Sequence, residues 1–325
     1  MGVDQTAAGP GRAPDAPDRP VRKTVPLRHP GRWVAVALIA LVFASFVHSA
    51  SANPNYQWSV VWHYLFSAPI LAGLSHTVEL TIVAMSIGIG LGTVFAVMRL
   101  SPNPVISKAA AVYIWMFRGI PVLVQLLFWY FLSALFPHLA LGIPFGPDLV
   151  AINTNRIITQ LTAAILGLGL SEAAYMAEIV RSGILSVPHG QTEAAKSLGM
   201  SGMLTMRRIV LPQALRIIIP PTGNETIGML KNTSMVIVIA YTDLLTSASL
   251  IYARTYETIP LLIVACIWYL AVTTVLMMLQ TGIERRFGRG FTPRREPGWW
   301  TRGRRRLFSR RPLAGEPGMR ESSDG

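Results

Sequence analysis

The sequence predicts an all-α protein that crosses a membrane six times. Of its 325 residues, 51% are hydrophobic, and several apolar runs approach the ~20 residues that a helix needs to cross a bilayer. The charge supports the same fold class, because most of the 29 Lys and Arg residues lie in the two ends of the chain, outside the apolar runs. The single cysteine, Cys266, lies inside an apolar run and excludes a disulfide within the chain.

The first expected span covers residues 33–50. Residues 1–32 before it are rich in Pro, Gly, Ala and charge, which is typical of a disordered tail. Residues 51–72 hold four Trp or Tyr residues and no Lys or Arg, which predicts an interfacial aromatic linker on the outer side. The other spans are expected at 76–98, 105–136, 161–185, 212–241 and 259–281, and residues 289–325 form a second, basic tail.

Two of these spans carry marks of their packing. Ala84, Gly88 and Gly92 recur every four residues in the second span, a spacing that suits close helix packing in lipid. The third span is interrupted by Arg-Gly-Ile-Pro at 118–121, which frees backbone groups that neighbours or a water-lined cavity must satisfy. Residues 137–158, with three prolines, are expected to form an outer loop.

The distribution of basic residues predicts the orientation. If both ends of the chain are cytoplasmic, every Lys and Arg lies on the inner side except Arg156 and Arg254 in outer loops and Lys231 within a span. The protein is therefore expected in the cell membrane with both termini in the cytoplasm.

One inner loop, residues 188–210, contains residues that typically start and end short helices. Pro188 suits the first turn of a helix, residues 192–198 favour helix, and Gly199 suits a left-handed stop. Ser201 can cap a second short helix that runs through Ile209. Helices this short are not stable alone in water, so we expect something to hold them.

The sequence Glu193-Ala194-Ala195, followed three residues later by Gly199, resembles the EAA loop in permease subunits of bacterial ABC importers. The resemblance implies a coupling helix that docks on a separate cytosolic ATPase, with contacts at Glu193, Ala194, Ala195 and Gly199. On the spacing alone, an ordinary interfacial amphipathic helix is the alternative.

Residues 190–197 also resemble a phosphate-binding loop whose second glycine is replaced. Such a loop needs a strand before it and a flexible glycine-rich turn, whereas here a membrane span precedes a helix-favouring segment. We therefore expect the chain to bind no ATP and no other cofactor, and to need a partner that hydrolyses ATP.

A wider resemblance covers about residues 73–288. The segments 117–131, 164–184, 209–234 and 259–269 are similar to permeases of polar amino acid importers of the histidine/glutamine/arginine type. This implies a five-helix type I ABC importer core, paired with a second permease copy or sibling, two ATPase subunits and an extracytoplasmic amino-acid-binding protein. The expected function is import of polar amino acids by alternating access, in contact with membrane lipid and not with nucleic acid; residues 33–50 form an extra span outside this core.

Charged residues within the spans are the candidate pathway residues. An acidic side chain at a span centre costs about 2.5–3.5 kcal/mol, so Glu172, Glu178 and Glu225 must face protein or water. Glu178 is expected to pair with Arg181 one helical turn away, whereas structural and pathway roles remain open for Glu172 and Lys231. The resemblance adds weaker pathway or gate roles for Arg118, Gln125, Glu172 and Lys231.

Two other functions remain as alternatives. The first is an ion-coupled secondary transporter with Glu172 as proton carrier, which normally has an internal inverted repeat that this sequence does not reveal. The second is a membrane-anchored scaffold whose Arg-rich tail binds nucleic acid or anionic lipid; the inner position of the tail favours lipid or plain topology. The six histidines are scattered and no base lies beside a nucleophile, so neither a metal site nor an enzyme is expected.

Overall fold

The computed structural model describes residues 30–142 and 148–287, so the predictions for both terminal tails lie outside the described residues. The chain divides into two compact units, one ending at Tyr56 and the other beginning at Gln57. The first unit contains helix α1 (Pro30–Ala52) and a 3-10 turn, η1 (Pro54–Tyr56). Apolar side chains cover all sides of α1, as in a helix surrounded by lipid, which agrees with the first predicted span.

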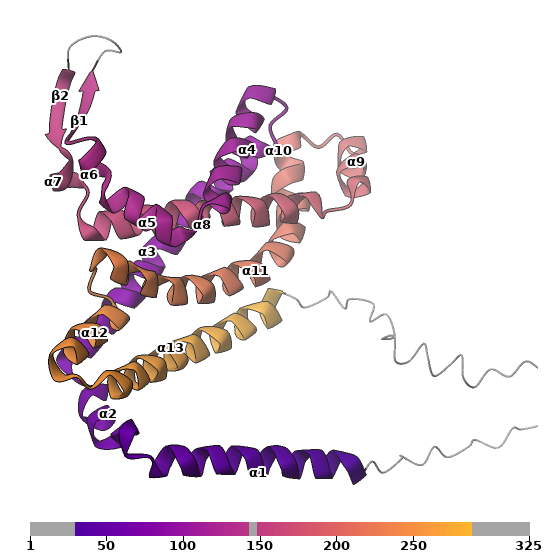
Figure 1. Cartoon of the computed structure of the whole chain (residues 1–325). Coiled ribbons are helices and arrows are strands. Elements are labelled where there is room, and N and C mark those ends of the chain that lie inside the picture. The colour runs from indigo at the N-terminus through magenta and orange to yellow at the C-terminus, as the bar shows by residue number, and fades with distance from the viewer. Residues whose placement is uncertain (1–29, 143–147, 288–325) are drawn as a thin grey trace, which may run out of the picture. The chain divides into compact units, whose positions relative to one another are not determined.

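The second unit is almost entirely helical (Figure 1). Its first half runs through α2 (Trp58–Leu65), α3 (Ala68–Arg99), α4 (Pro104–Gly119), α5 (Val122–Tyr130), α6 (Leu132–Leu135), strands β1 (His138–Gly142) and β2 (Asp148–Asn153), and α7 (Thr154–Ile157). Its second half runs through α8 (Gln160–Leu185), α9 (His189–Ser197), α10 (Gly202–Thr205), a π-helical segment η2 (Met206–Val210), α11 (Leu211–Asn232), a 3-10 segment η3 (Thr233–Ile239), α12 (Leu244–Thr255) and α13 (Thr258–Phe287).

Within the described residues, four helices, namely α1, α3, α8 and α13, are long and apolar enough to cross a membrane. Two bent pairs raise the number to as many as six: α4 with α5, and the run from α10 to η3 with α12. The all-α membrane class is confirmed, and the six predicted spans correspond to the upper count.

The packing of α3 against α8 is the most extensive helix contact in the described residues. Gly88 and Gly92 lie at this contact, as their spacing predicts. A Cβ atom at residue 88 would lie 2.5 Å from Cγ of Glu172, and one at residue 92 would lie 2.5 Å from Cβ of Met176. Only glycine therefore allows the two helices to approach this closely.

The predicted break at residues 118–121 is present as a bend of 100° between α4 and α5. Gln125 spans this bend, because its buried Nε2 donates hydrogen bonds to the carbonyl oxygens of Phe117 (2.9 Å) and Ile120 (2.8 Å). The side chain thus satisfies two carbonyl groups at the interruption, which is what non-helical backbone at membrane depth requires.

Three segments differ from the prediction. The expected aromatic linker at residues 51–72 contains α2 and the start of α3, and Val61 and Leu65 hold it in a small core with α12 and α13. The outer loop holds an antiparallel hairpin of β1 and β2, in which His138 pairs with Asn153. Residues after Tyr241 form α12, which begins where the buried carboxylate of Asp243 accepts a hydrogen bond from the backbone N–H of Thr246 (2.9 Å).

The inner loop also joins α11 differently from the expectation. Ser201 does cap a short helix, but that helix does not end before Pro212; it continues through η2 directly into α11. Pro212 follows the π-helical turn, in which the N–H of Leu211 bonds to the carbonyl oxygen of Met206, and the helical run continues through it. The described chain therefore links the loop rigidly to the long helix that follows it.

Candidate functional site

Helix α9 is a short helix between the end of α8 and α10 (Figure 1). It begins one residue after Pro188, which occupies the N-cap position rather than the first turn. Gly199 ends the helix with φ of +76°, the left-handed conformation that its position predicts. Two backbone hydrogen bonds complete this end, from Gly199 N to Lys196 O (2.9 Å) and from Met200 N to Ala195 O (3.1 Å), the pattern of a Schellman cap.

One side of α9 packs on its own chain. Ala195 is buried against the following segment, where α9 contacts α10 and η2. The partner contact expected at Ala195 stays a prediction, and within this chain the residue is 3% exposed. Its small size allows α9 to lie close to η2.

The other side of α9 is exposed. Glu193, Ala194 and Gly199 are all exposed, so these three predicted contact residues remain accessible. Two apolar side chains that the sequence reasoning missed lie near them, Leu198 (82% exposed) and Met203 (79% exposed). Their signal was present in the sequence, since each is a large apolar residue within a short polar loop on the side rich in Lys and Arg.

A second group of functional side chains lies along α8. Glu172 is 4% exposed, and its Oε1 atom has no hydrogen-bond partner among the described residues. Its aliphatic stem packs on Gly88 of α3. A buried carboxyl oxygen without a partner is costly, which makes Glu172 the strongest pathway candidate in the described part of the chain.

Charged groups from two other helices approach the same face of α8. Glu225 of α11 lies within electrostatic range of Glu172, and Arg118 at the end of α4 lies within range of Glu225 and Glu178. The guanidinium carbon of Arg118 is 5.3 Å from the centre of the Tyr175 ring, a cation–π contact. Glu225 thus lies within electrostatic range of both Glu172 and Arg118, and Arg118 contacts Tyr175. We call these four residues the charged cluster.

The remaining predicted residues have other surroundings. Glu178 and Arg181 form the expected ion pair, in which Arg181 donates from Nε (2.9 Å) and Nη2. Gln125 donates from Nε2 to carbonyl oxygens at the bend between α4 and α5, while its buried Oε1 has no hydrogen-bond partner among the described residues; its pathway role stays a prediction. Lys231 is exposed near the end of α11, and its side chain makes no ion pair within the described residues.

The sequence matches a family model described as "Binding-protein-dependent transport system inner membrane component" over residues 88–289, which is more than half of the chain. The chain belongs to this family. The match begins within α3 and ends just after α13, so it includes α8, α9, α11 and both groups of candidate residues.

Relatives of this permease transport amino acids. The chain is 48% identical over 285 residues to the arginine transport system permease protein ArgU of Corynebacterium glutamicum, covering 87% of this chain and 88% of that protein. It is 31% identical over 233 residues to the glutamine transport system permease protein GlnP of Escherichia coli K12, covering 71% of this chain and 98% of that protein.

A solved structure supports the same assignment. The permease resembles a chain in the crystal structure of an amino acid ABC transporter with histidines, with a TM-score of 0.57, 37% sequence identity, and coverage of 67% of this chain and 94% of that chain. The protein is thus a permease subunit of an amino acid ABC transporter with a type I importer fold. The alternative of an ion-coupled secondary transporter has no support among these relatives.

Proposed function

We propose that this permease imports cationic amino acids by alternating access, driven by a separate ATPase subunit that docks on α9. The observation that carries the proposal is the geometry of α9: a helix capped by its own backbone, seated on its own chain through Ala195, with Glu193, Ala194 and Leu198 turned outward. A short helix that is held in this way can move as one unit when the ATPase displaces it, and it does not unfold.

Helix α9 is connected through α8 and α11 to the charged cluster. Helix α9 follows α8, which carries Glu172, and is joined through α10 and η2 to α11, which carries Glu225. A displacement of α9 therefore acts on both carboxyl groups at once. When the ATPase pair closes and moves α9, the cavity between the paired permeases opens outward; a loaded binding protein favours the same state, so the two signals cooperate.

The number of partners in this proposal follows from the presence of one coupling helix, α9, in each permease chain. Each α9 serves one ATPase, so a complete pore needs a second permease, either another copy or a sibling, and two ATPase subunits. The permease binds no ATP itself, and an extracytoplasmic binding protein delivers the amino acid, in keeping with the family description. Both termini and α9 lie on the cytoplasmic side, as the basic residues indicate.

The charged cluster supports a cationic substrate. The cluster holds two carboxyl groups, Glu172 and Glu225, and one guanidinium, Arg118, which lies within electrostatic range of Glu225; carboxylate oxygens accept hydrogen bonds from a substrate ammonium or guanidinium group. Arg118 remains available for the substrate carboxylate. The relative with 48% identity is an arginine transport permease, which agrees with this chemistry.

The coupling part is tested by charge reversal at Glu193 in the complete transporter reconstituted in vesicles. We expect Glu193→Lys to lower uptake at least tenfold and to abolish the ATP hydrolysis that substrate-loaded binding protein stimulates, while membrane insertion is unchanged. Lys108→Glu, a charge reversal of the same size and opposite sign at an exposed position of α4, is the control and should transport normally. Normal transport by Glu193→Lys would refute the coupling role of α9.

The substrate part is tested by competition. Labelled arginine should be taken up and displaced by excess lysine or ornithine but not by glutamate, and Glu172→Gln should reduce this uptake at least tenfold without loss of assembly. Uptake that prefers acidic amino acids would contradict the cationic assignment while leaving the coupling role of α9 intact.

A further inference from the structure

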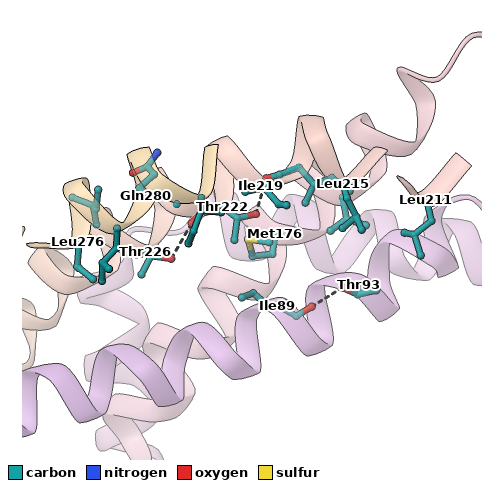
Figure 2. Close-up of a pocket in the computed structure, with 16 residues that line it drawn as sticks. Ile89, Thr93, Met176, Leu211, Leu215, Ile219, Thr222, Thr226, Leu276 and Gln280 are labelled. Atoms are coloured by element: carbon teal, nitrogen blue, oxygen red, sulfur yellow. Dashed lines mark hydrogen bonds between the residues drawn. The ribbon is translucent and has the colours of Figure 1, made fainter. Parts of the chain in front are cut away.

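An apolar groove of about 560 Å³ lies between α3, α8, α11 and α13. Figure 2 shows side chains of these helices around it, including Ile89 of α3, Met176 of α8, Ile219 of α11 and Leu276 of α13. Along α11 the lining runs from Leu211 to Ile227, which at 1.5 Å per residue is about 24 Å of helix. The groove is therefore long, and it runs nearly parallel to a membrane helix.

The threonines in the groove do not make it polar. Each hydroxyl donates its hydrogen to a carbonyl oxygen of its own helix: Thr93 to Ile89 (2.7 Å), Thr222 to Ile218 (2.8 Å) and Thr226 to Thr222 (2.9 Å). The amide of Gln280 is likewise engaged with Asn224 and Glu284. Aliphatic carbon thus dominates the surface, and a polar ligand would lose hydrogen bonds there without replacement.

Basic side chains lie at one end of the groove. A smaller cavity of about 340 Å³ shares Leu211 and Leu215 with it and adds Arg216 of α11 and Arg286 of α13. Both arginines are exposed, and neither forms an ion pair with any residue that the structure describes. Two unpaired guanidinium groups at the mouth of an apolar groove favour a ligand with an anionic head and a hydrocarbon chain.

We propose that this groove binds an anionic phospholipid, with its phosphate between Arg216 and Arg286 and one acyl chain along α11. The hydrocarbon of one leaflet is about 15 Å thick, half of a core of about 30 Å, and the groove exceeds this length. In the orientation proposed above, the lipid belongs to the cytoplasmic leaflet. The site goes beyond the transport function and places a lipid against the helix that α9 moves.

The groove is too small to enclose a whole helix. A helix with its side chains is about 10 Å across, so a 24 Å length would fill on the order of 2,000 Å³, more than the groove holds. A membrane helix of a second copy would therefore lie over the groove, and the cross-link below distinguishes it from a lipid. The apolar lining in turn excludes the polar amino acid that the transporter carries.

The test compares lipids retained by the full-length permease after extraction from nanodiscs that contain phosphatidylcholine and phosphatidylglycerol in a ratio of 4:1. Native mass spectrometry should find about one phosphatidylglycerol bound per permease. The double variant Arg216→Ala/Arg286→Ala should lower this retention at least fivefold. The matched control, Lys108→Ala/Arg285→Ala, removes the same charge at exposed positions outside both cavities and should retain the lipid.

A second variant separates the groove from general attraction of anionic lipid. Ile219→Trp fills the groove from α11 and leaves both arginines in place, so it should lower retention as far as the double variant does. Retention that is equal in wild type and the double variant, or equally lowered by the control, would overturn the proposal. A cross-link from Leu215→Cys in a Cys266→Ser background to a second copy or to α1 would also overturn it.

Discussion

At the scale of single residues, the position of Glu172 depends on the absence of a side chain opposite it. The carboxyl group is buried and one oxygen lacks a protein partner, while its stem occupies the space that a Cβ at Gly88 would need. A membrane protein tolerates such a buried acidic group where the group serves the transported substrate. The sequence reveals Glu172 and Gly88 separately. Only the packing of α3 on α8 shows that the missing side chain of Gly88 leaves the space for Glu172.

Gly88→Ala tests this dependence. The added methyl group would lie 2.5 Å from Glu172 Cγ, so the carboxyl group must shift, at a cost of about 1–3 kcal/mol for overpacking. We expect uptake to fall at least tenfold with a smaller loss of thermal stability. Gly90→Ala on the same helix meets no atom within 4 Å and should behave as wild type; equal effects of the two changes would contradict the account.

Gln125 provides a second residue-scale prediction. Replacing it with Leu removes the two hydrogen bonds that its Nε2 donates across the bend between α4 and α5, worth about 1 kcal/mol each. The thermal unfolding midpoint in detergent should fall by several degrees. Gln160→Leu, at an exposed position of α8, is the control, and a midpoint for Gln125→Leu no lower than this control would show that the bend does not depend on Gln125.

At the scale of elements, α9 is held by backbone geometry at its end and by one small side chain on its inner face. Gly199 has open space where a Cβ would be, so the constraint is its positive φ and not crowding. The sequence predicts this stop because glycine is the residue most often found there. The sequence does not predict which face of α9 is buried, because Ala194 and Ala195 are the same residue type. Only the contact with η2 distinguishes them.

Gly199→Ala should loosen this cap. A left-handed residue other than glycine costs about 1–2 kcal/mol, so amide hydrogen exchange in residues 189–200 should speed up several-fold and uptake should fall. Gly190→Ala is the matched control, because residue 190 lies in the helical first turn of α9, where alanine is favoured over glycine. Faster exchange in the control, or unchanged exchange in Gly199→Ala, would contradict this role of the cap.

The elements that the sequence did not predict share a physical cause. Helix α12 and the linker segment with α2 are short and stabilised by tertiary contacts: Trp268 Nε1 of α13 donates to Leu65 O (2.8 Å), and Tyr269 of α13 donates to Asp243 (3.2 Å) at the start of α12. Such contacts join residues far apart in the sequence and leave no local pattern. Long apolar spans were predicted well because hydropathy alone determines them.

At the scale of the whole molecule, the proposed coupling connects two sites in the chain. One is the exposed face of α9 with Glu193, Leu198 and Met203; the other is the charged cluster between α4, α8 and α11. Helix α9 follows α8 after residues 186–188, its C-terminal end is capped at Gly199, and α10 continues through η2 into α11. Membership of the permease family explains the arrangement of these helices. The packing of α9 on its own chain explains why the loop is rigid.

The most direct measurement of the central claim is a cross-link between α9 and the ATPase in intact membranes. In a Cys266→Ser background, Leu198→Cys should form a disulfide or short cross-link to the ATPase subunit under mild oxidation, more readily when ATP is bound. Tyr256→Cys, equally exposed (88%) after α12, should form none and should react only with reagents outside the cell. A cross-link at position 256 with none at 198, or labelling of position 198 from outside, would contradict the account.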